Sequence, residues 1–404
     1  AVYVWGASNH GALGVDAEPK EEYFLPTHLG GASNDVREAG GAAGRGGILC
    51  TRRITGLAGG DSHSVAIDNI GNVYAWGRNK EGQAGQGIRS DSVTTPCLVE
   101  ALLHERAVAV AAGASHTLCL TKSGRVYAFG AHHKKNEDAS MAFFGVGSAA
   151  GELEEQKWRM IEESHMAYFN NSTAGIHARE DVPDSHSSGA AVGEGSRQIL
   201  RSDNGQSTSA FQREIRSTPW NVELPDRETV THIAAGHCFS AVIVQGGRLY
   251  TWGYNDSGQL GLGDRYSREA PTFVNGPPVR AVCCGEQHMC VIERDEGVPF
   301  SSGHGVFGQL GLGAKRGTLV LEKVTHFASA LSTEGLGPSL ACSQVSAGLY
   351  HTVFLTVDGD VYVCGHREYG QQGQSTDIGS HDAGGGERSR SDGVTVPTYL
   401  CLAA

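Results

Sequence analysis

Short runs of alternating apolar and polar residues occur in pairs along this chain, and most pairs are separated by a glycine. Residues 116–130, HTLCLTKSGRVYAFG, are one example, with Gly124 between the two runs. Alternation with a period of two is typical of half-buried strands, and glycine readily adopts the positive φ that a tight hairpin turn requires. The pattern therefore predicts a β-hairpin at this position.

The same pattern recurs at constant intervals. Five copies begin at Ala58, Ala111, Ala234, Cys283 and Ser346, and a partial copy, VYVWGASNHGALG, opens the chain at Val2. In four copies the first glycine is followed after three, eight and six residues: Gly60–His63–Gly71–Gly77, Gly113–His116–Gly124–Gly130, Gly236–Phe239–Gly247–Gly253 and Gly348–His351–Gly359–Gly365. A second interval, of five and then three residues, follows Gly6, Gly77, Gly253, Gly303 and Gly365. Such regularity indicates a structural repeat.

Each copy holds enough residues for four strands. After the second glycine series we expect a short strand that follows a proline, near Pro96, Pro219 and Pro271. The period is 53 residues from Gly77 to Gly130 and 50 from Gly253 to Gly303. Four short strands at this period are typical of propeller blades, so we predict an all-β propeller with six recognisable units.

The consensus AAGxxHTxxLTxxGxVYxWGxNxxGQLGxG resembles the regulator of chromosome condensation repeat. The copies lack the Trp-Asp end of WD repeats, and a kelch-type double glycine occurs only at Gly246 and Gly247. The resemblance implies a ring that usually closes with seven blades. The first unit lacks its HTxxLT half, so we expect closing strands beyond Ala404 and an upstream segment before Ala1. A six-bladed or open ring is the alternative.

Several stretches do not follow the repeat. We expect one propeller domain over residues 1–404, interrupted by disordered insertions near 30–47, 170–217 and 374–393, which are rich in Gly, Ser, Ala and charge. The insertion 131–169 differs, because Leu153, Trp158, Ile161 and Tyr168 recur near helical spacing between glutamates. It is predicted to be ordered or partly helical, and to pack on its own propeller or to contact a partner.

Charge and cysteine usage narrow the function classes. The chain has a net charge of −12, so no direct DNA binding is expected. Ten cysteines in 404 residues, without CxxC pairs, are typical of reduced, buried thiols in an intracellular protein; those in predicted strands are Cys119, Cys283, Cys284, Cys290 and Cys364. No apolar run reaches the length of a membrane span.

The sequence offers no catalytic, cofactor-binding or metal-binding set. The repeated histidines His63, His116, His288 and His351 fall at equivalent places in different blades, so we expect them to bind backbone within each blade rather than to converge on a metal. The glycine-rich loops do not join a strand to a helix as phosphate-binding loops do. We therefore expect no enzyme activity and no cofactor.

The resemblance implies two functions. One is a non-enzymatic scaffold that docks a protein or ribonucleoprotein partner through face loops and insertions; the alternative is a guanine-nucleotide exchange factor for a Ran-like or mitochondrial small GTPase. Because the insertions differ most from the repeat, the expected partner-binding residues are His132, His133, Lys134, Lys135, Phe143, Phe144, Trp158 and Tyr168.

Two finer resemblances bear on function and location. Plant ultraviolet-B photoreceptors of this family use tryptophans in a GWRHT motif, and the matching stretches here, such as GDSH and GEQH, contain none. The opening stretch, with Ala12 where the family usually has Gln, is similar to the start of mature mitochondrial chromosome-condensation-regulator-like proteins. This resemblance implies a mitochondrial location, with the cytoplasm as the alternative.

Overall fold

The computed structural model describes residues 2–15, 22–29, 48–131, 215–328, 340–368, 370–373 and 393–400. All of them belong to one of two compact units of the chain, which comprises residues 1–134 and 213–404. The other unit, residues 135–212, lies outside the described residues. The fold below is that of the first unit.

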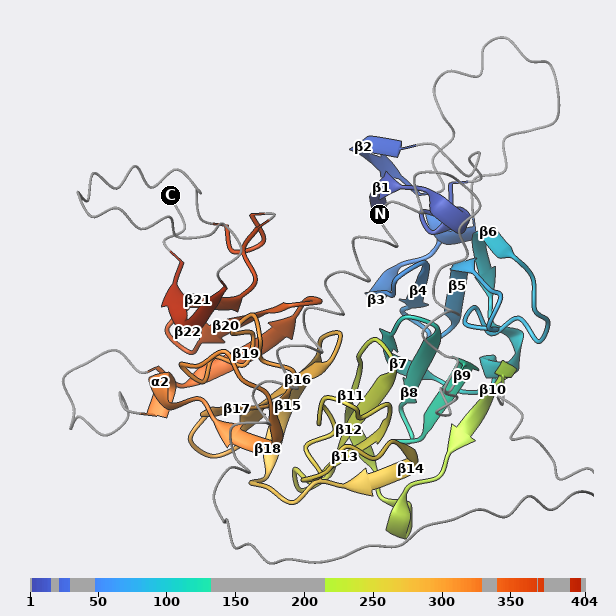
Figure 1. Ribbon diagram of the computed structural model, residues 1–404. Helices are drawn as coiled ribbons and strands as arrows, with labels where there is room; N and C mark the ends of the chain where they lie inside the picture. Colours follow the sequence, from blue (N-terminus) through green and yellow to red (C-terminus); the bar gives the residue numbers. More distant parts are fainter. Residues whose placement is uncertain are drawn as a thin grey trace, which may run out of the picture. The chain divides into compact units, whose positions relative to one another are not determined.

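The described residues form one two-stranded and five four-stranded antiparallel sheets, drawn in sequence order in Figure 1. Sheet I contains β1 (Tyr3–Ala7) and β2 (Glu22–His28). Sheet II contains β3 (Ile54–Gly59), β4 (His63–Asp68), β5 (Val73–Arg78) and β6 (Ser92–Leu98). Sheet III contains β7 (Ala107–Ala112), β8 (His116–Thr121), β9 (Val126–Ala131) and β10 (Ile215–Val222).

The last three sheets repeat this order. Sheet IV contains β11 (Val230–Ala235), β12 (Phe239–Val244), β13 (Leu249–Gly253) and β14 (Arg268–Phe273). Sheet V contains β15 (Val279–Cys284), β16 (His288–Glu293), β17 (Pro299–Gly303) and β18 (Thr318–Lys323). Sheet VI contains β19 (Cys342–Ala347), β20 (His351–Thr356), β21 (Val361–Gly365) and β22 (Val394–Tyr399). The prediction of an all-β fold made of four-stranded units is confirmed.

Helices are few and short in these ranges. They are the 3₁₀ turns η1 (Asn9–Gly11), η2 (Ile48–Thr51), η3 (Glu100–Leu102) and η5 (Pro225–Arg227), and the single-turn α2 (Thr325–Ala328). They lie in the loops and connections between strands. None has the length and apolar character that a membrane crossing requires.

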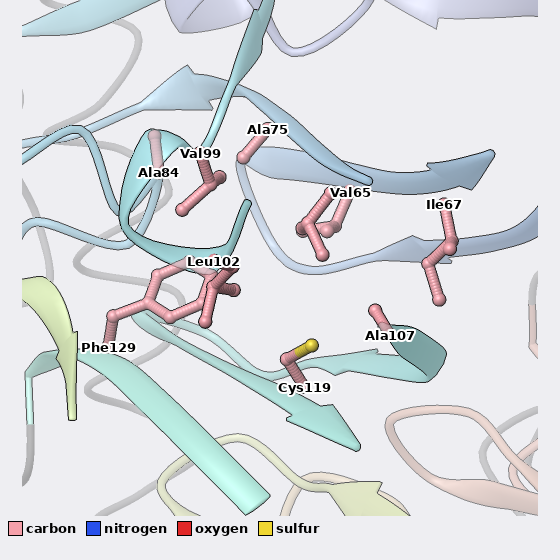
Figure 2. Packing of buried hydrophobic residues seen from close by; sticks show 10 residues of the cluster. Val65, Ile67, Ala75, Ala84, Val99, Leu102, Ala107, Cys119 and Phe129 are labelled. Atoms are coloured by element: carbon pink, nitrogen blue, oxygen red, sulfur yellow. The ribbon is translucent and has the colours of Figure 1, made fainter. Parts of the chain in front are cut away.

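The hydrophobic core lies between consecutive sheets. Every residue of β8 is buried, because one face of this strand packs toward sheet II and the other toward sheet IV. Figure 2 shows Phe129 and Cys119 of sheet III packed with Val65, Val99 and Leu102 of the sheet II region. Burying a side chain the size of Phe stabilises a fold by about 1.5–3 kcal/mol. Sheets II to V are therefore each stabilised by two neighbours, and among the described residues sheets I and VI each pack against one.

The outer strands correct two expectations. Pro96, Pro219 and Pro271 lie inside β6, β10 and β14 rather than before them. Each proline is in the short stretch where the register with the third strand shifts, and these are edge strands, so the missing N–H removes no ladder bond. The insertion predicted to extend to residue 217 ends earlier, because β10 begins at Ile215 and pairs with Ala131.

Candidate functional site

One edge of every four-stranded sheet carries two loops. Because the strands are antiparallel, the loop between the first and second strands and the loop after the third strand lie at the same edge. We call this surface the loop face. Its described part consists of residues 60–62, 113–115, 236–238, 285–287 and 348–350 in the first set of loops, and of 79–81, 254–257, 304–307 and 366–368 in the second.

The longer loops are held by side chains of the repeat motif. In sheet IV, Asn255 Oδ1 accepts a hydrogen bond from Leu260 N at 2.9 Å, and its Nδ2 donates to Asp264 O at 3.0 Å. Gln259 Oε1 accepts from Ser257 N at 3.0 Å. Asn79 and Gln83 make the matching bonds in sheet II. The conserved spacing of Asn and Gln in the copies thus builds the loop and leaves its tip to vary.

The repeated histidines connect consecutive sheets. His288 Nε2 lies 2.9 Å from the hydroxyl oxygen of Thr352, and that hydroxyl donates to Gln309 O at 2.7 Å. The hydroxyl gives its one proton to the carbonyl, so the ring must donate from Nε2. His63, Thr117 and Gln83 form the same bridge between sheets II and III. We call this arrangement the histidine–hydroxyl bridge.

These bridges correct the role expected for the histidines. The ring of His116 likewise lies 3.1 Å from Ser240 Oγ of sheet IV, so in sheets II, III and V the histidine ring bonds a side chain of the next sheet. Between sheets IV and V the two positions are Phe239 and Met289, both buried in one apolar cluster. An apolar pair therefore replaces the polar one at that junction.

Burial keeps the bridging histidines neutral. Loss of hydration lowers the pKa of His63 to about 4 and that of His288 to about 3. In both rings Nδ1 is buried without a hydrogen-bond partner among the described atoms, so a second ring proton would have no acceptor. The bridges are structural, and no group of three or more His, Cys, Asp or Glu side chains in the described ranges is placed to hold a metal ion.

The loop tips differ from sheet to sheet. Between the fixed glycine and the histidine position the two tip residues are Asp61–Ser62, Ala114–Ser115, His237–Cys238, Glu286–Gln287 and Leu349–Tyr350. Asp61 Oδ2 lies 3.4 Å from His237 Nδ1, so tips of sheets II and IV reach each other. The uniform framework therefore presents a different chemistry at each sheet.

Aromatic rings gather at the tips of sheets V and VI. The ring centre of Phe307 lies 5.0 Å from that of Tyr350, 4.8 Å from that of His366 and 6.1 Å from that of His304. Next to them the side chain of Leu349 is 54% exposed. Burial lowers the pKa of His366, and the nearby Glu368 carboxylate, 3.4 Å from its Nε2, opposes this shift.

The predicted partner-binding residues cannot be placed in this geometry. His132, His133, Lys134, Lys135, Phe143, Phe144, Trp158 and Tyr168 all lie outside the described residues. The sequence did not predict the aromatic cluster, because Phe307, Tyr350 and His366 are far apart along the chain. Only the packing of sheet V against sheet VI brings them together. Its sequence signal was the departure of GHGVFG, GLYH and GHRE from the repeat consensus.

Comparisons with known proteins agree with this geometry. Two models of the regulator of chromosome condensation (RCC1) repeat match the chain, one over residues 71–120 and 246–292, the other over 54–83, 107–134, 230–259 and 342–371. The ultraviolet-B receptor UVR8 of Arabidopsis thaliana is 30% identical over 332 residues, which cover 81% of this chain and 68% of the receptor. The human E3 ubiquitin-protein ligase HERC2 is 27% identical over 351 residues, but this chain spans only 7% of its length.

A solved structure shows the same fold. The structure of Prp20p from Saccharomyces cerevisiae, which was described together with its binding to Gsp1p and histones, aligns with 99% of this chain and 74% of its own, with a TM-score of 0.65. Sequence identity in this alignment is 19%, so the likeness concerns the fold. The propeller architecture expected from the repeat is confirmed.

Proposed function

Because this chain belongs to the RCC1 repeat family, we propose that it is a non-enzymatic scaffold that docks a protein partner on its loop face. The observation that carries the proposal is the contrast between framework and tips. Glycines, loop-holding Asn and Gln side chains and histidine–hydroxyl bridges recur from sheet to sheet, whereas the residues at the tips do not. Variable loops on a rigid scaffold are the usual site of recognition.

The aromatic cluster is the strongest candidate for the centre of the contact. Interface hot spots are rich in aromatic side chains that fill well-packed, desolvated sites. Phe307 and Tyr350 are half-buried within the cluster, and Leu349 extends an aliphatic side chain beside them. The imidazole rings of His304 and His366 add hydrogen-bonding groups to the cluster. This chemistry suits a protein surface better than a phosphate backbone.

The family supplies a second candidate function. The structural neighbour Prp20p was described with its binding to Gsp1p, and this motivates guanine-nucleotide exchange as the alternative. A ribonucleoprotein partner and a mitochondrial location remain predictions from the sequence. UVR8 is a photoreceptor by name, but the tips of the present loops contain no tryptophan, so light reception is not proposed.

Two matched substitutions in sheet VI test the scaffold. Leu349 on the loop face and Val357 at the opposite edge are each 54% exposed. We expect Leu349→Asp to reduce recovery of the partner with the tagged full-length protein by about tenfold or more, because a charge at the centre of an interface is costly. Val357→Asp should leave recovery unchanged while placing the same charge on the same sheet. Equal recovery with the two variants would contradict the proposal.

Two further arms of the experiment separate the alternatives. Deletion of residues 134–168 should abolish recovery if the insertion, rather than the loop face, makes the main contact. Release of labelled guanine nucleotide from Ran and from a mitochondrial GTPase should accelerate above background if the protein is an exchange factor. Acceleration that Leu349→Asp removes would replace the scaffold by the exchange function on the same surface.

A further inference from the structure

The edge opposite to the loop face carries a hollow between sheets II and III. This edge, which we call the turn face, contains the turns between second and third strands. The hollow has a volume of about 410 Å³ and is open to solvent on one side. Its walls are the turn after β4, the start of β7 and the turn after β8, and its lining residues include Asp68, Ile70, Arg106, Val108 and Lys122.

Backbone hydrogen bonds fix the walls of the hollow. Lys122 N donates to Arg106 O at 2.7 Å, and Ala107 N donates to Gly71 O at 3.1 Å, so the turns of the two sheets are joined through the start of β7. The core shown in Figure 2 lies directly beneath, where Ala107 packs with Ile67. The hollow is therefore part of a rigid junction and not a gap between loose loops.

The surface of the hollow is both apolar and basic. Ile70 is 59% exposed and Val108 is 55% exposed, so two aliphatic side chains face solvent at the same hollow. Arg106 and Lys122 are exposed, and neither makes an ion pair with another described residue. The Asp68 carboxylate at the floor is buried and accepts hydrogen bonds from Ile70 N, from Asn72 N and Nδ2 and from Tyr74 OH. These neutral donors hold it in place, and it makes no ion pair with either cation, although its negative charge remains at the floor of the hollow.

The corresponding positions in other sheets lack this combination. Thr229 and Gln245 of sheet IV occupy the positions of Arg106 and Lys122, because Gln245 N donates to Thr229 O in the same way. In sheet VI, Val357 N donates to Ala341 O, and neither residue is charged. Sheets II and V have one cation each at the matching positions, Arg53 with Asn69 and Arg294 with Pro278. A pair of cations at these positions is thus a property of this junction rather than of the repeat.

We propose that the hollow binds an acidic peptide segment of a partner protein, with an aliphatic or aromatic side chain against Ile70 and Val108 and a flanking carboxylate paired with Arg106 and Lys122. A carboxylate can accept hydrogen bonds from both cations, and the two aliphatic side chains need an apolar occupant to cover them. A nucleic acid fits less well, since a phosphate backbone could pair with the two cations but would leave Ile70 and Val108 uncovered. This surface is separate from the loop face, so the inference stands whether or not the proposed function holds.

Selection from a phage-displayed library of random dodecapeptides tests the proposal on the full chain. Peptides enriched on the wild-type protein should contain Asp or Glu next to a large apolar residue. For an individual enriched peptide, Arg106→Ser with Lys122→Gln should weaken binding about tenfold, and high salt should weaken it as well. Ile70→Ser should weaken the same peptide, which a purely ionic site would not do.

The control has the same net charge. Thr229→Glu with Gln245→Glu adds two negative charges at the matching positions of sheet IV, and Arg106→Ser with Lys122→Gln removes two positive ones, so both proteins change by the same amount. The control should bind the enriched peptide as the wild type does. Equal loss in both variants, or no acidic enrichment on the wild type, would overturn the proposal. Binding of a labelled single-stranded oligonucleotide that Arg106→Ser with Lys122→Gln abolishes and Ile70→Ser leaves intact would assign the hollow to nucleic acid instead.

Discussion

Replacing Gly253 by Ala is expected to destabilise the protein by about 2–5 kcal/mol, as a positive φ costs about 1–2 kcal/mol for a residue with a Cβ and overpacking about 1–3 kcal/mol more. Gly253 ends β13 with a φ of +106°, opposite Phe239 of β12. A Cβ there would lie 2.6 Å from Cys238 O and 2.7 Å from Phe239 Cα. Both are backbone atoms that cannot move away without opening the strand pair. Urea unfolding followed by the fluorescence of the buried Trp252 would measure the loss.

Sheet I supplies a control for the part of the Gly253→Ala destabilisation that comes from the backbone conformation alone. Gly6 occupies the equivalent position of β1 with a φ of +107°, and no described atom lies within 4 Å of a Cβ built on it. Gly6→Ala should therefore cost only the conformational part, about 1–2 kcal/mol. Equal destabilisation by the two substitutions would show that crowding at the end of the third strand is not what requires glycine.

Acidification below pH 6.5 should destabilise the folded protein through His63 and His288. Their pKa values are lowered in the fold, to about 4 and about 3, from the ordinary value near 6.5, so the unfolded chain takes up protons that the folded one refuses. This contribution to stability is fully present above pH 6.5 and is lost as the pH falls toward the folded-state values. At pH 5 each histidine should cost about 2 kcal/mol.

The Phe239 and Met289 pair suggests the matching substitution. His288→Phe with Thr352→Met copies the apolar junction of sheets IV and V into the junction of sheets V and VI. The double variant should fold and should lose less stability between pH 7 and pH 5 than the wild type does. An unchanged pH dependence in the double variant would contradict the account of the bridges.

Thr352→Val alone leaves the buried N–H of His288 without its acceptor and should cost about 1–3 kcal/mol at neutral pH.

Local features of the sequence predicted the strands because their causes are local. Gly71 and Gly77 adopt the positive φ that the hairpin turn and the strand end require, so regular glycine spacing marks the ends of the strands. The bridges were not predictable in this way. His63 and Thr117 are 54 residues apart, and their contact depends on how two sheets pack rather than on either segment alone. The pattern is also not uniform among the copies, because Phe239 and Met289 together replace the histidine and the hydroxyl at one junction.

The candidate surfaces were predictable only in part. The sequence directed attention to the insertion 131–169, whose residues 132–169 lie outside the described residues, because it differs most from the repeat. The loop tips between the first and second strands contain only two variable residues per sheet. Two residues in each copy are a weak sequence signal compared with a long insertion. Their importance follows from the fold, which brings Phe307, Tyr350 and His366 to one place and Arg106 beside Lys122.

The central claim is that the loop face docks a protein partner. Amide hydrogen exchange tests it most directly, measured on the full-length protein alone and in complex with the partner that is recovered with it. The account predicts slower exchange on binding in the loop face of sheets V and VI, in residues 285–287, 304–307 and 348–350. The turns of the same sheets, residues 294–298 and 357–360, should exchange at the same rate in both states. Protection confined to those turns, or unchanged exchange throughout the loop face in a stable complex, would contradict the assignment of the loop face as the docking surface.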